Sequence, residues 1–364
     1  MRKMILTTRQ ATFWFTLHQL GSALLVIPST LVFIAKQDAW LAVPVALAAH
    51  LLLLLLYFRI ANRLNGQTFH EHVVSILGKW GGGLCLVVFV MAYPFLTFTL
   101  VIRDLGDFLT GVMMPETPSE AIYLLMLAAV WYVVHGGVRT IGRTVELLFF
   151  AFLFLFVLLT VSLIPSMNMD YILPLFENGP KPIFLASISL FAFPYFESVL
   201  FLFLASHMQY IQQWKTVVVR SALLSGGMFF LVVFVVIGVI SQGVVADVAY
   251  PSFFVVRTIS IGGFFERFEV IVAVLWYITI FFRLSLLLYV SSYALAGIFR
   301  LKDWRSLLIP LCTLGFFIAP LTWPNTSVQM QSIRAWPYYT VLFGVLFPMV
   351  IWLIGSFRGN HGKK

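Results

Sequence analysis

Charged residues are scarce in this sequence. Only 10% of the 364 residues are Asp, Glu, Lys or Arg, whereas 61% are hydrophobic. A soluble domain carries about 25% charged residues, so this composition excludes a water-soluble globular protein. Apolar runs recur along the whole chain, and we predict an all-α integral membrane protein with ten transmembrane helices.

Cysteine and clustered metal ligands are also scarce. The two cysteines, Cys85 and Cys312, lie inside apolar runs, which argues against a disulfide or a cysteine-based metal site. His70 and His72 stand two positions apart, a spacing that places their rings on different faces of a helix. No group of His, Asp and Glu has the spacing of a metal or nucleophilic site, so we expect no cofactor, no metal and no enzymatic activity.

Acidic residues are fewer than basic ones, 14 against 23, which gives a net charge of +9. The basic residues gather in the loops on one side of the ten predicted spans: sixteen on the side of the amino terminus and six on the other. We therefore expect both termini in the cytoplasm and no nucleic-acid partner. The predicted spans are 11–34, 39–57, 83–103, 121–138, 145–164, 183–204, 217–241, 269–298, 307–321 and 338–354.

A proline and a carboxylate interrupt the sixth predicted span. Pro194 lacks the N–H that completes a helical turn, so it kinks or breaks the helix. An ionised Glu197 at the bilayer centre costs about 3 kcal/mol, so it is expected to face protein or water. Broken backbone at this depth is tolerated only in a cavity or inside protein. A simple kink beside a protonated glutamate is the alternative to a binding site.

The first predicted span has a similar interruption. Small residues from Gly21 onward precede Pro28, beside a polar cluster of His18, Gln19 and Ser22. The interrupted spans are the first and the sixth, an odd offset of five, so two halves of five would have opposite orientations. Paired interruptions of this kind point to a midplane binding site of a transporter fold. A close contact between helices is the alternative interpretation of Gly21.

The two interruptions resemble motifs of the amino acid–polyamine–organocation transporters. The segment from Gly21 to Pro28 resembles their first-helix motif, with Ala23 replacing the middle glycine. The segment from Phe191 to Glu197 resembles their sixth-helix motif, with Pro194-Tyr195 replacing a flexible residue and a glycine. The closer resemblance is to the permease-like B subunit of spore germinant receptors. It rests on Asp38-Ala39-Trp40-Leu41, Arg143 to Glu146, Pro174 to Pro182, and most of all Tyr250-Pro251 through Arg257 and Glu266-Arg267-Phe268-Glu269 to Trp276.

This resemblance implies a fold of the leucine-transporter type with broken first and sixth helices. Two inverted five-helix repeats, approximately 9–164 and 180–355, would form a single membrane domain, 1–364, with a polar tail at 357–364. Free N–H groups after Ser22 suit a ligand carboxylate, and unwound carbonyls near Phe191 suit an ammonium group. The small apolar pocket favours an alanine- or valine-like amino acid. The predicted ligand-binding residues are Gly21, Ser22, Ala23, Leu24, Leu25, Tyr93, Thr97, Phe191, Ala192, Phe193, Tyr195, Glu197 and Leu287.

Arg283 and Glu197 are the predicted ion or coupling residues. Arg283 is the only basic residue deep inside a predicted span, and such charges are functional candidates. It is expected to stand as a fixed cation where a sodium ion would otherwise bind. The alternative is a structural pair with a carboxylate such as Glu197 or Glu146.

Two functions are compatible with these residues. The resemblance implies an amino-acid-sensing subunit of a spore germination receptor in the spore inner membrane, acting with a second multi-span subunit and a lipoprotein subunit. The alternative is a stand-alone secondary amino acid transporter of the cell membrane, proton-coupled or uncoupled. One fold supports both functions, and the germination-type motifs favour the receptor.

Overall fold

The computed structural model describes residues 6–257, 269–324 and 326–361, except for the side chains of 326, 327, 330–334 and 359–361. Glu266–Phe268 of the diagnostic motif and residues 362–364 of the tail lie outside the described residues. The part of the chain that is described is helical and contains no strand.

Fifteen α-helices make up most of the described chain. They are α1 (Thr8–Leu20), α2 (Ala23–Ala35), α3 (Ala39–Ala61), α4 (Phe69–Leu77), α5 (Lys79–Val90), α6 (Leu96–Phe108), α7 (Ser119–His135), α8 (Val138–Leu163), α9 (Pro180–Ala192), α10 (Ile211–Asp247), α11 (Pro251–Arg257), α12 (Glu269–Ile298), α13 (Leu308–Ile318), α14 (Thr326–Val341) and α15 (Phe347–His361). Six 3₁₀ segments connect them: η1 (Lys36–Asp38), η4 (Ile164–Ser166), η5 (Met169–Tyr171), η6 (Tyr195–His207), η7 (Trp304–Leu307) and η8 (Ala319–Leu321). Three π-helical turns are η2 (Met91–Phe95), η3 (Leu109–Met113) and η9 (Leu342–Leu346).

Eight helical segments in the described ranges are long and apolar enough to cross a membrane, which supports an integral membrane protein. The difference from the ten predicted spans arises at the amino-terminal half. α1 is too short on its own because it stops at a break, and Ala23–Ala61 combines α2 with α3. α7, with 17 residues, is a shorter apolar helix. The eight segments are Ala23–Ala61, Lys79–Met113, Val138–Ser166, Pro180–His207, Ile211–Asp247, Glu269–Ile298, Trp304–Leu321 and Ala335–Arg358.

The first break lies between α1 and α2. A capping box formed by Thr7 and Gln10 starts α1, and the N–H of Gly21 closes its last turn on Leu17. Gly21 has a φ of +24°, which ends the regular helix, and α2 resumes at Ala23. The break is therefore confined to Gly21 and Ser22, and the next three predicted ligand-binding residues, Ala23, Leu24 and Leu25, already form the first turn of α2.

The second break lies between α9 and η6. α9 ends at Ala192, Phe193 is extended, and the 3₁₀ helix η6 runs for 13 residues from Tyr195. The N–H of Phe193 still reaches the carbonyl of Ser189, so the helix continues one residue further than expected. The backbone therefore unwinds from Phe193 onward, whereas Phe191 and Ala192, near which unwound carbonyls were predicted, belong to the last turn of α9.

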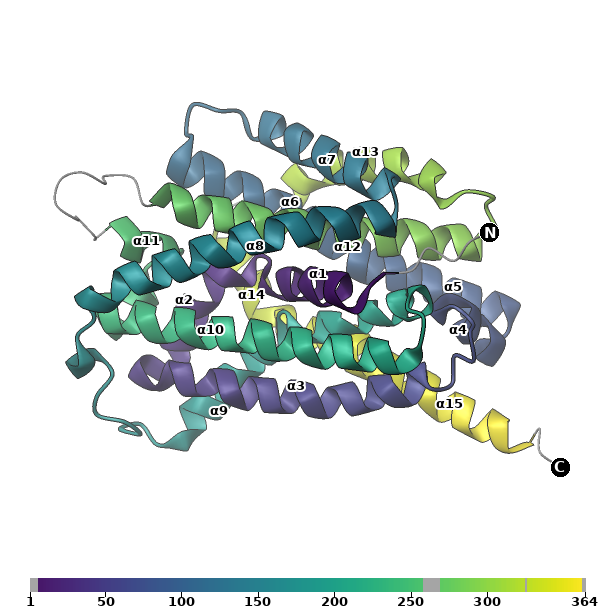
Figure 1. Cartoon of the computed structure of the whole chain (residues 1–364), viewed down its shortest axis with the longest axis horizontal. Helices are drawn as coiled ribbons and strands as arrows, with labels where there is room; N and C mark the ends of the chain where they lie inside the picture. Colours follow the sequence, from purple (N-terminus) through teal and green to yellow (C-terminus); the bar gives the residue numbers. More distant parts are fainter. Residues whose placement is uncertain (1–5, 258–268, 325, 362–364) are drawn as a thin grey trace.

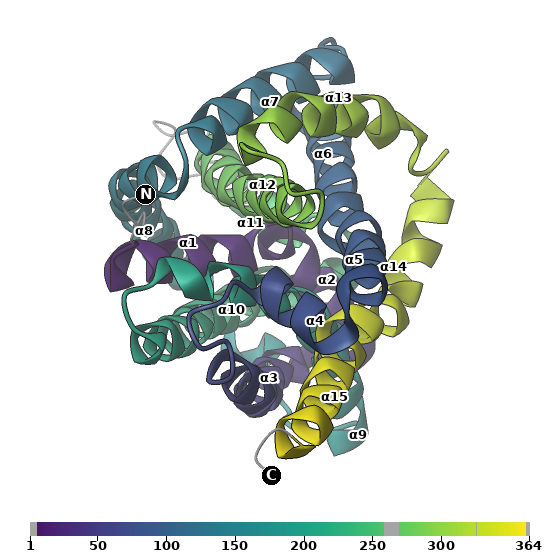
Figure 2. The ribbon, with the colours of Figure 1, turned by 90° about the vertical axis from the view of Figure 1, so that its right-hand side faces the viewer.

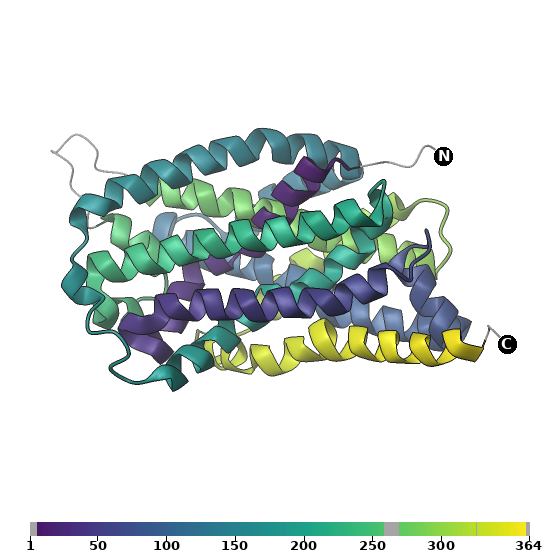
Figure 3. The same cartoon turned by 60° about the horizontal axis from the view of Figure 1, so that its bottom comes forward.

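The long helices run side by side along the bundle. α3, α8 and α10 extend lengthwise, and α1 and α2 follow each other between α8 and α10 (Figure 1). In the view along the long axis, α2 and α12 lie near the middle, with α3, α7, α13 and α15 around the periphery (Figure 2). α15 lies along one face beside α3 (Figure 3). α1, α2 and η6 are thus largely buried, whereas α9 lies at the edge of the bundle and exposes Phe184 and Ile188 (Figure 2).

Different helices and connections lie at the two ends of the bundle (Figure 1). The start of α1, the short helix α4 and the end of α15 all lie at the right-hand end in Figure 1. The connection after α8 and the helix α11 lie at the opposite end (Figure 1). The two termini of the described chain therefore share one end.

Candidate functional site

A buried ion pair lies where the two helix breaks meet. Nη2 of Arg283, on α12, is 2.5 Å from Oε1 of Glu197, on η6, and neither side chain is exposed. The guanidinium also lies over the ring of Phe193, 4.6 Å from its centroid, at the second break. Glu146, the other carboxylate considered for Arg283, pairs instead with Arg9 at 2.7 Å. Of the two carboxylates, tertiary packing therefore pairs Arg283 with Glu197.

His18 extends this pair to a third helix. Its Nε2 lies 3.3 Å from the second carboxylate oxygen of Glu197, and it is equally buried. A buried charge that loses its partner is strongly unfavourable, so Glu197 links α1, η6 and α12 energetically. His18 belongs to the polar cluster noted in the first span, although the sequence did not place it in the site.

Side chains from two other helices support the backbone at the first break. Thr279 of α12 donates its hydroxyl to the carbonyl of Gly21 at 3.3 Å and to that of Trp276 at 2.8 Å. Ser252 of α11 donates to the carbonyl of Leu24 at 2.9 Å. The carbonyl of Gly21 lies at the break itself, whereas the carbonyl of Leu24 lacks its helical partner because Pro28, four residues further on, has no N–H. The two hydroxyls satisfy both carbonyls.

A second buried network lies beside the ion pair. Gln19 donates to Ser198 at 3.1 Å and accepts from Ser225 at 2.8 Å. The ring nitrogen Nε2 of His50 lies 3.4 Å from the Ser198 hydroxyl, and the ring stacks on Tyr195 at 4.4 Å between centroids. The contact between Gln19 and Ser198 therefore lies directly beside the contact between His18 and Glu197, because the residues of each pair are adjacent in sequence. Gln19, His50, Ser198 and Ser225 were not among the predicted ones, and the adjacent pairs His18-Gln19 and Glu197-Ser198 were the available signal.

Several buried polar atoms around the breaks have no hydrogen-bond partner in the described chain. Two of the three guanidinium nitrogens of Arg283, Nε and Nη1, are among them, as are the hydroxyls of Tyr93 and Thr97. Tyr93 lies within electrostatic range of both Glu197 and Arg283. An unpaired buried polar group costs about 1–3 kcal/mol, so most such groups in proteins are paired. These groups are therefore polar atoms that the described side chains around them leave without a hydrogen bond.

The predicted site residues fall into two groups. In the first group, Arg283 contacts both Gly21 and Glu197. Leu287 lies one helical turn beyond Arg283 on α12. Tyr195 instead stacks on His50, and Phe191 pairs with Phe196 at 4.5 Å. Most of the set is buried, whereas Phe191 and Phe193 are partly exposed. The buried residues are Gly21, Ser22, Ala23, Leu24, Leu25, Tyr93, Thr97, Ala192, Tyr195, Glu197 and Leu287.

Metal ligands do not gather anywhere in the part of the chain that the structure describes. No group of three or more His, Cys, Asp and Glu side chains is placed there to hold an ion.

Sequence comparison identifies the family of the chain. A family model described as "Spore germination protein" matches residues 5–328. The chain belongs to the spore germination protein family. The match includes both helix breaks, Glu197 and Arg283. The ion pair is therefore part of the family's own domain.

Three curated spore germination proteins align with this chain along nearly their whole length. Spore germination protein KB of Bacillus subtilis (strain 168) is 26% identical over 370 residues, which covers 100% of this chain and 98% of that protein. Spore germination proteins B2 and A2 of the same organism are 23% and 22% identical, over 98% and 95% of this chain and 97% and 94% of their own lengths. The resemblance inferred from the motifs is confirmed at the level of the family.

Proposed function

We propose that this chain is the amino-acid-sensing subunit of a spore germinant receptor and that it is not an enzyme. The family and the names of its relatives support a role in germination. By resemblance to receptor B subunits, it acts with a second multi-span subunit and a lipoprotein subunit in the spore inner membrane. The buried pair Arg283–Glu197 at the meeting point of the two breaks carries the assignment of the site.

The proposed fold has ten spans in two inverted repeats. In this fold, α1 and α2 together form the first span, and α3 forms the second. The continuous segment Ala23–Ala61 therefore contains the second half of the first span and the whole of the second span. The 17 residues of α7 extend about 26 Å at 1.5 Å each, close to the roughly 30 Å of the hydrocarbon core. An even number of spans agrees with α1 starting and α15 ending at one end of the bundle (Figure 1). The excess of basic residues supports a cytoplasmic location for that end.

An amino acid matches the charges of the proposed site. Its carboxylate binds the Nε and Nη1 groups of Arg283 and the N–H groups that follow Ser22. Its ammonium group binds Glu197 and the extended backbone at Phe193. The buried apolar side chains of Ala23, Leu24 and Leu287 suit a small aliphatic ligand side chain, which favours alanine or valine.

The same geometry provides a signal. A bound carboxylate on Nε and Nη1 shares the charge of Arg283 with Glu197, and a bound ammonium shares the charge of Glu197 with Arg283. Binding therefore weakens the connection between η6 and α12, two elements that otherwise share a buried charge pair. With a weaker connection, η6 and α12 move relative to each other, and the partner subunits detect this movement. Arg283 is the fixed cation of the site, so binding requires no sodium ion.

A binding titration tests this function. The purified chain, alone and with its co-expressed partner subunits, is titrated with each of the twenty amino acids in sodium-free buffer. We expect binding of alanine or valine, weakened roughly ten- to a hundredfold by Arg283→Gln, as for a lost charged hydrogen bond. Arg139→Gln, which removes an exposed arginine of α8, is the matched control and should bind normally.

Three results would change the proposal. If neither the chain nor its complex binds any amino acid, the sensing function is wrong. If Arg283→Gln binds as tightly as the parent, the function stands but the site lies elsewhere. Robust uptake of an amino acid into liposomes by the chain alone would favour the transporter, a function that the paired helix breaks also support.

A further inference from the structure

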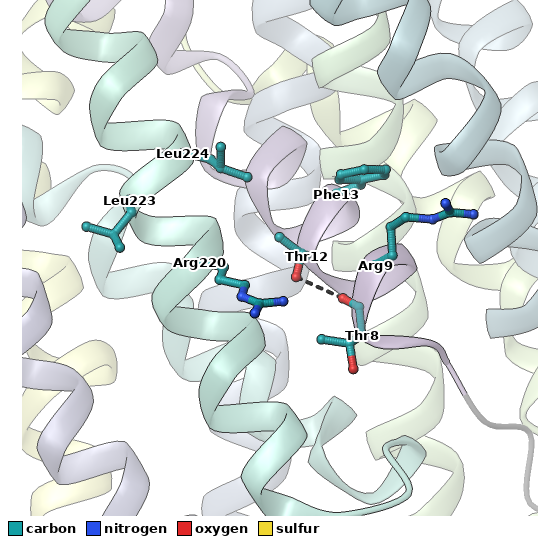
Figure 4. Close-up of a pocket in the computed structure, with 7 residues that line it drawn as sticks. All are labelled: Thr8, Arg9, Thr12, Phe13, Arg220, Leu223 and Leu224. Carbon is teal, nitrogen blue, oxygen red and sulfur yellow. Dashed lines mark hydrogen bonds between the residues drawn. The ribbon is translucent and has the colours of Figure 1, made fainter.

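A groove separate from the ligand centre opens between α1 and α10. It has a volume of about 610 Å³ and lies near the start of α1. Figure 4 shows the residues that line it, with Arg220 and Leu224 on α10 facing Thr8 and Thr12 on α1. Its full lining is Thr8, Arg9, Thr12, Phe13, Arg220, Leu223 and Leu224.

Polar and apolar residues follow the same order on both helices. On α1, Arg9 is followed one turn deeper by Phe13, whose ring stacks on Phe149 of α8. On α10, Arg220 is followed one turn deeper by Leu223 and Leu224. Both helices start at the same end of the bundle, so the groove is basic toward that end and apolar toward the interior of the membrane (Figures 1 and 4).

Arg220 is the free charge of this groove. Its exposed guanidinium points across the groove toward α1 (Figure 4) and pairs with no acidic side chain in the described chain. Arg9 is already held by Glu146 at 2.7 Å, on the side away from α10. Leu223 and Leu224 are 50% and 40% exposed, so apolar surface continues directly from the charge.

We propose that this groove binds an anionic phospholipid of the membrane leaflet at the α1 end. The phosphate accepts hydrogen bonds from Arg220 and from the hydroxyl of Thr8, and Arg9 adds positive potential. One acyl chain lies along Leu223 and Leu224 toward Phe13. A free phosphate ion would contact only the basic end of the groove. A phospholipid contacts the basic end with its headgroup and the apolar end with its acyl chain. The proposal depends on membrane insertion and not on the identity of the amino acid ligand.

Lipid selectivity is the first measurement. The full chain is reconstituted in zwitterionic nanodiscs, and its affinity for added fluorescent phosphatidylglycerol and phosphatidylcholine is measured at low salt. We expect phosphatidylglycerol to bind about tenfold more tightly to the parent chain, the effect of one charged hydrogen bond. Arg220→Gln should remove this preference, and Arg139→Gln, an exposed arginine outside the groove, should keep it.

Two further measurements distinguish a bound phospholipid from a bound inorganic phosphate ion. Leu224→Gln, which keeps the charge, should weaken phosphatidylglycerol binding and leave the affinity for inorganic phosphate unchanged. Inorganic phosphate at millimolar concentration should displace little lipid. If Arg220→Gln keeps the preference, or if phosphate displaces the lipid fully, the groove is not a phospholipid site. Folding of each variant is checked by its melting temperature in phosphatidylcholine nanodiscs.

Discussion

Arg283 occupies the space that a side chain at Gly21 would need. A Cβ atom built on Gly21 would lie 2.5 Å from Cδ and 2.9 Å from Nη1 of Arg283. Gly21 also has a φ of +24°, a backbone conformation that L side chains rarely adopt. The first helix break and the buried arginine are therefore one packing unit, although 262 positions of chain separate them.

Gly21→Ala should lower both stability and ligand affinity. The added methyl group displaces Arg283 from Glu197 and strains the backbone, and overpacking of this kind costs about 1–3 kcal/mol. The measurement is the melting temperature of the detergent-solubilised chain, followed by the amino acid titration. Gly227→Ala on α10 is the matched control, because a Cβ there meets no atom within 4 Å. Equal melting temperatures for the two variants would show that Arg283 can move at no cost.

The ion pair should show strong coupling in a double-mutant cycle. Glu197→Gln or Arg283→Gln alone leaves a buried charge without its partner, which costs about 3–5 kcal/mol, whereas the double variant removes both charges. The loss in unfolding free energy of the double variant should therefore be smaller than the sum of the two single losses. Unfolding in detergent by a chemical denaturant measures all four proteins.

The exposed pair Arg9–Glu146 is the control for that cycle. Its side chains are 64% and 23% exposed, and exposed pairs contribute about 0–1 kcal/mol. Arg9→Gln, Glu146→Gln and their double variant should show little coupling. Similar coupling energies in the two cycles would mean that water reaches Glu197 and Arg283 in the folded protein.

The docking of α4 should weaken as the pH falls. The ring of His70 packs against Gly297 and lies edge-on to Tyr293 of α12, 5.6 Å between centroids. Burial lowers the pKa of His70, against a raising effect of the Glu71 carboxylate, and burial together with the charge of Arg63 lowers the pKa of His72. Both rings are therefore neutral when docked but become protonated when exposed below about pH 6.5. The undocked state then binds more protons, so stability decreases with falling pH.

Amide hydrogen exchange localises this effect. Corrected for intrinsic rates, exchange of α4 should increase relative to that of α3 between about pH 7.5 and pH 5.5. The double variant His70→Gln, His72→Gln should lose this dependence, whereas His135→Gln, at an exposed position on α7, should keep it. A ratio of α4 to α3 exchange that does not change with pH would contradict the prediction.

The sequence determined the class of the protein and the positions of its helix breaks. Low charge and recurring apolar runs require helices in a membrane, because the bilayer satisfies no backbone polar group. Gly21 and Pro194 act through local backbone geometry, so the breaks could be placed within a few residues from the sequence. Their exact limits depended on single hydrogen bonds, such as the one from Phe193 to Ser189, which local patterns do not fix.

Only the tertiary structure decided which polar residues meet. Glu197 and Arg283 are 86 positions apart, and the sequence left Glu146 as an alternative partner of Arg283. The packing of η6 on α12 places Glu197 at 2.5 Å from Arg283. Gln19, His50, Ser198 and Ser225 form one network because α1, α3, η6 and α10 converge. Residue type and spacing specify what a side chain is able to bind. The distance between two charges on different helices depends on how those helices pack, and the sequence pattern of one helix does not specify which helix packs against it.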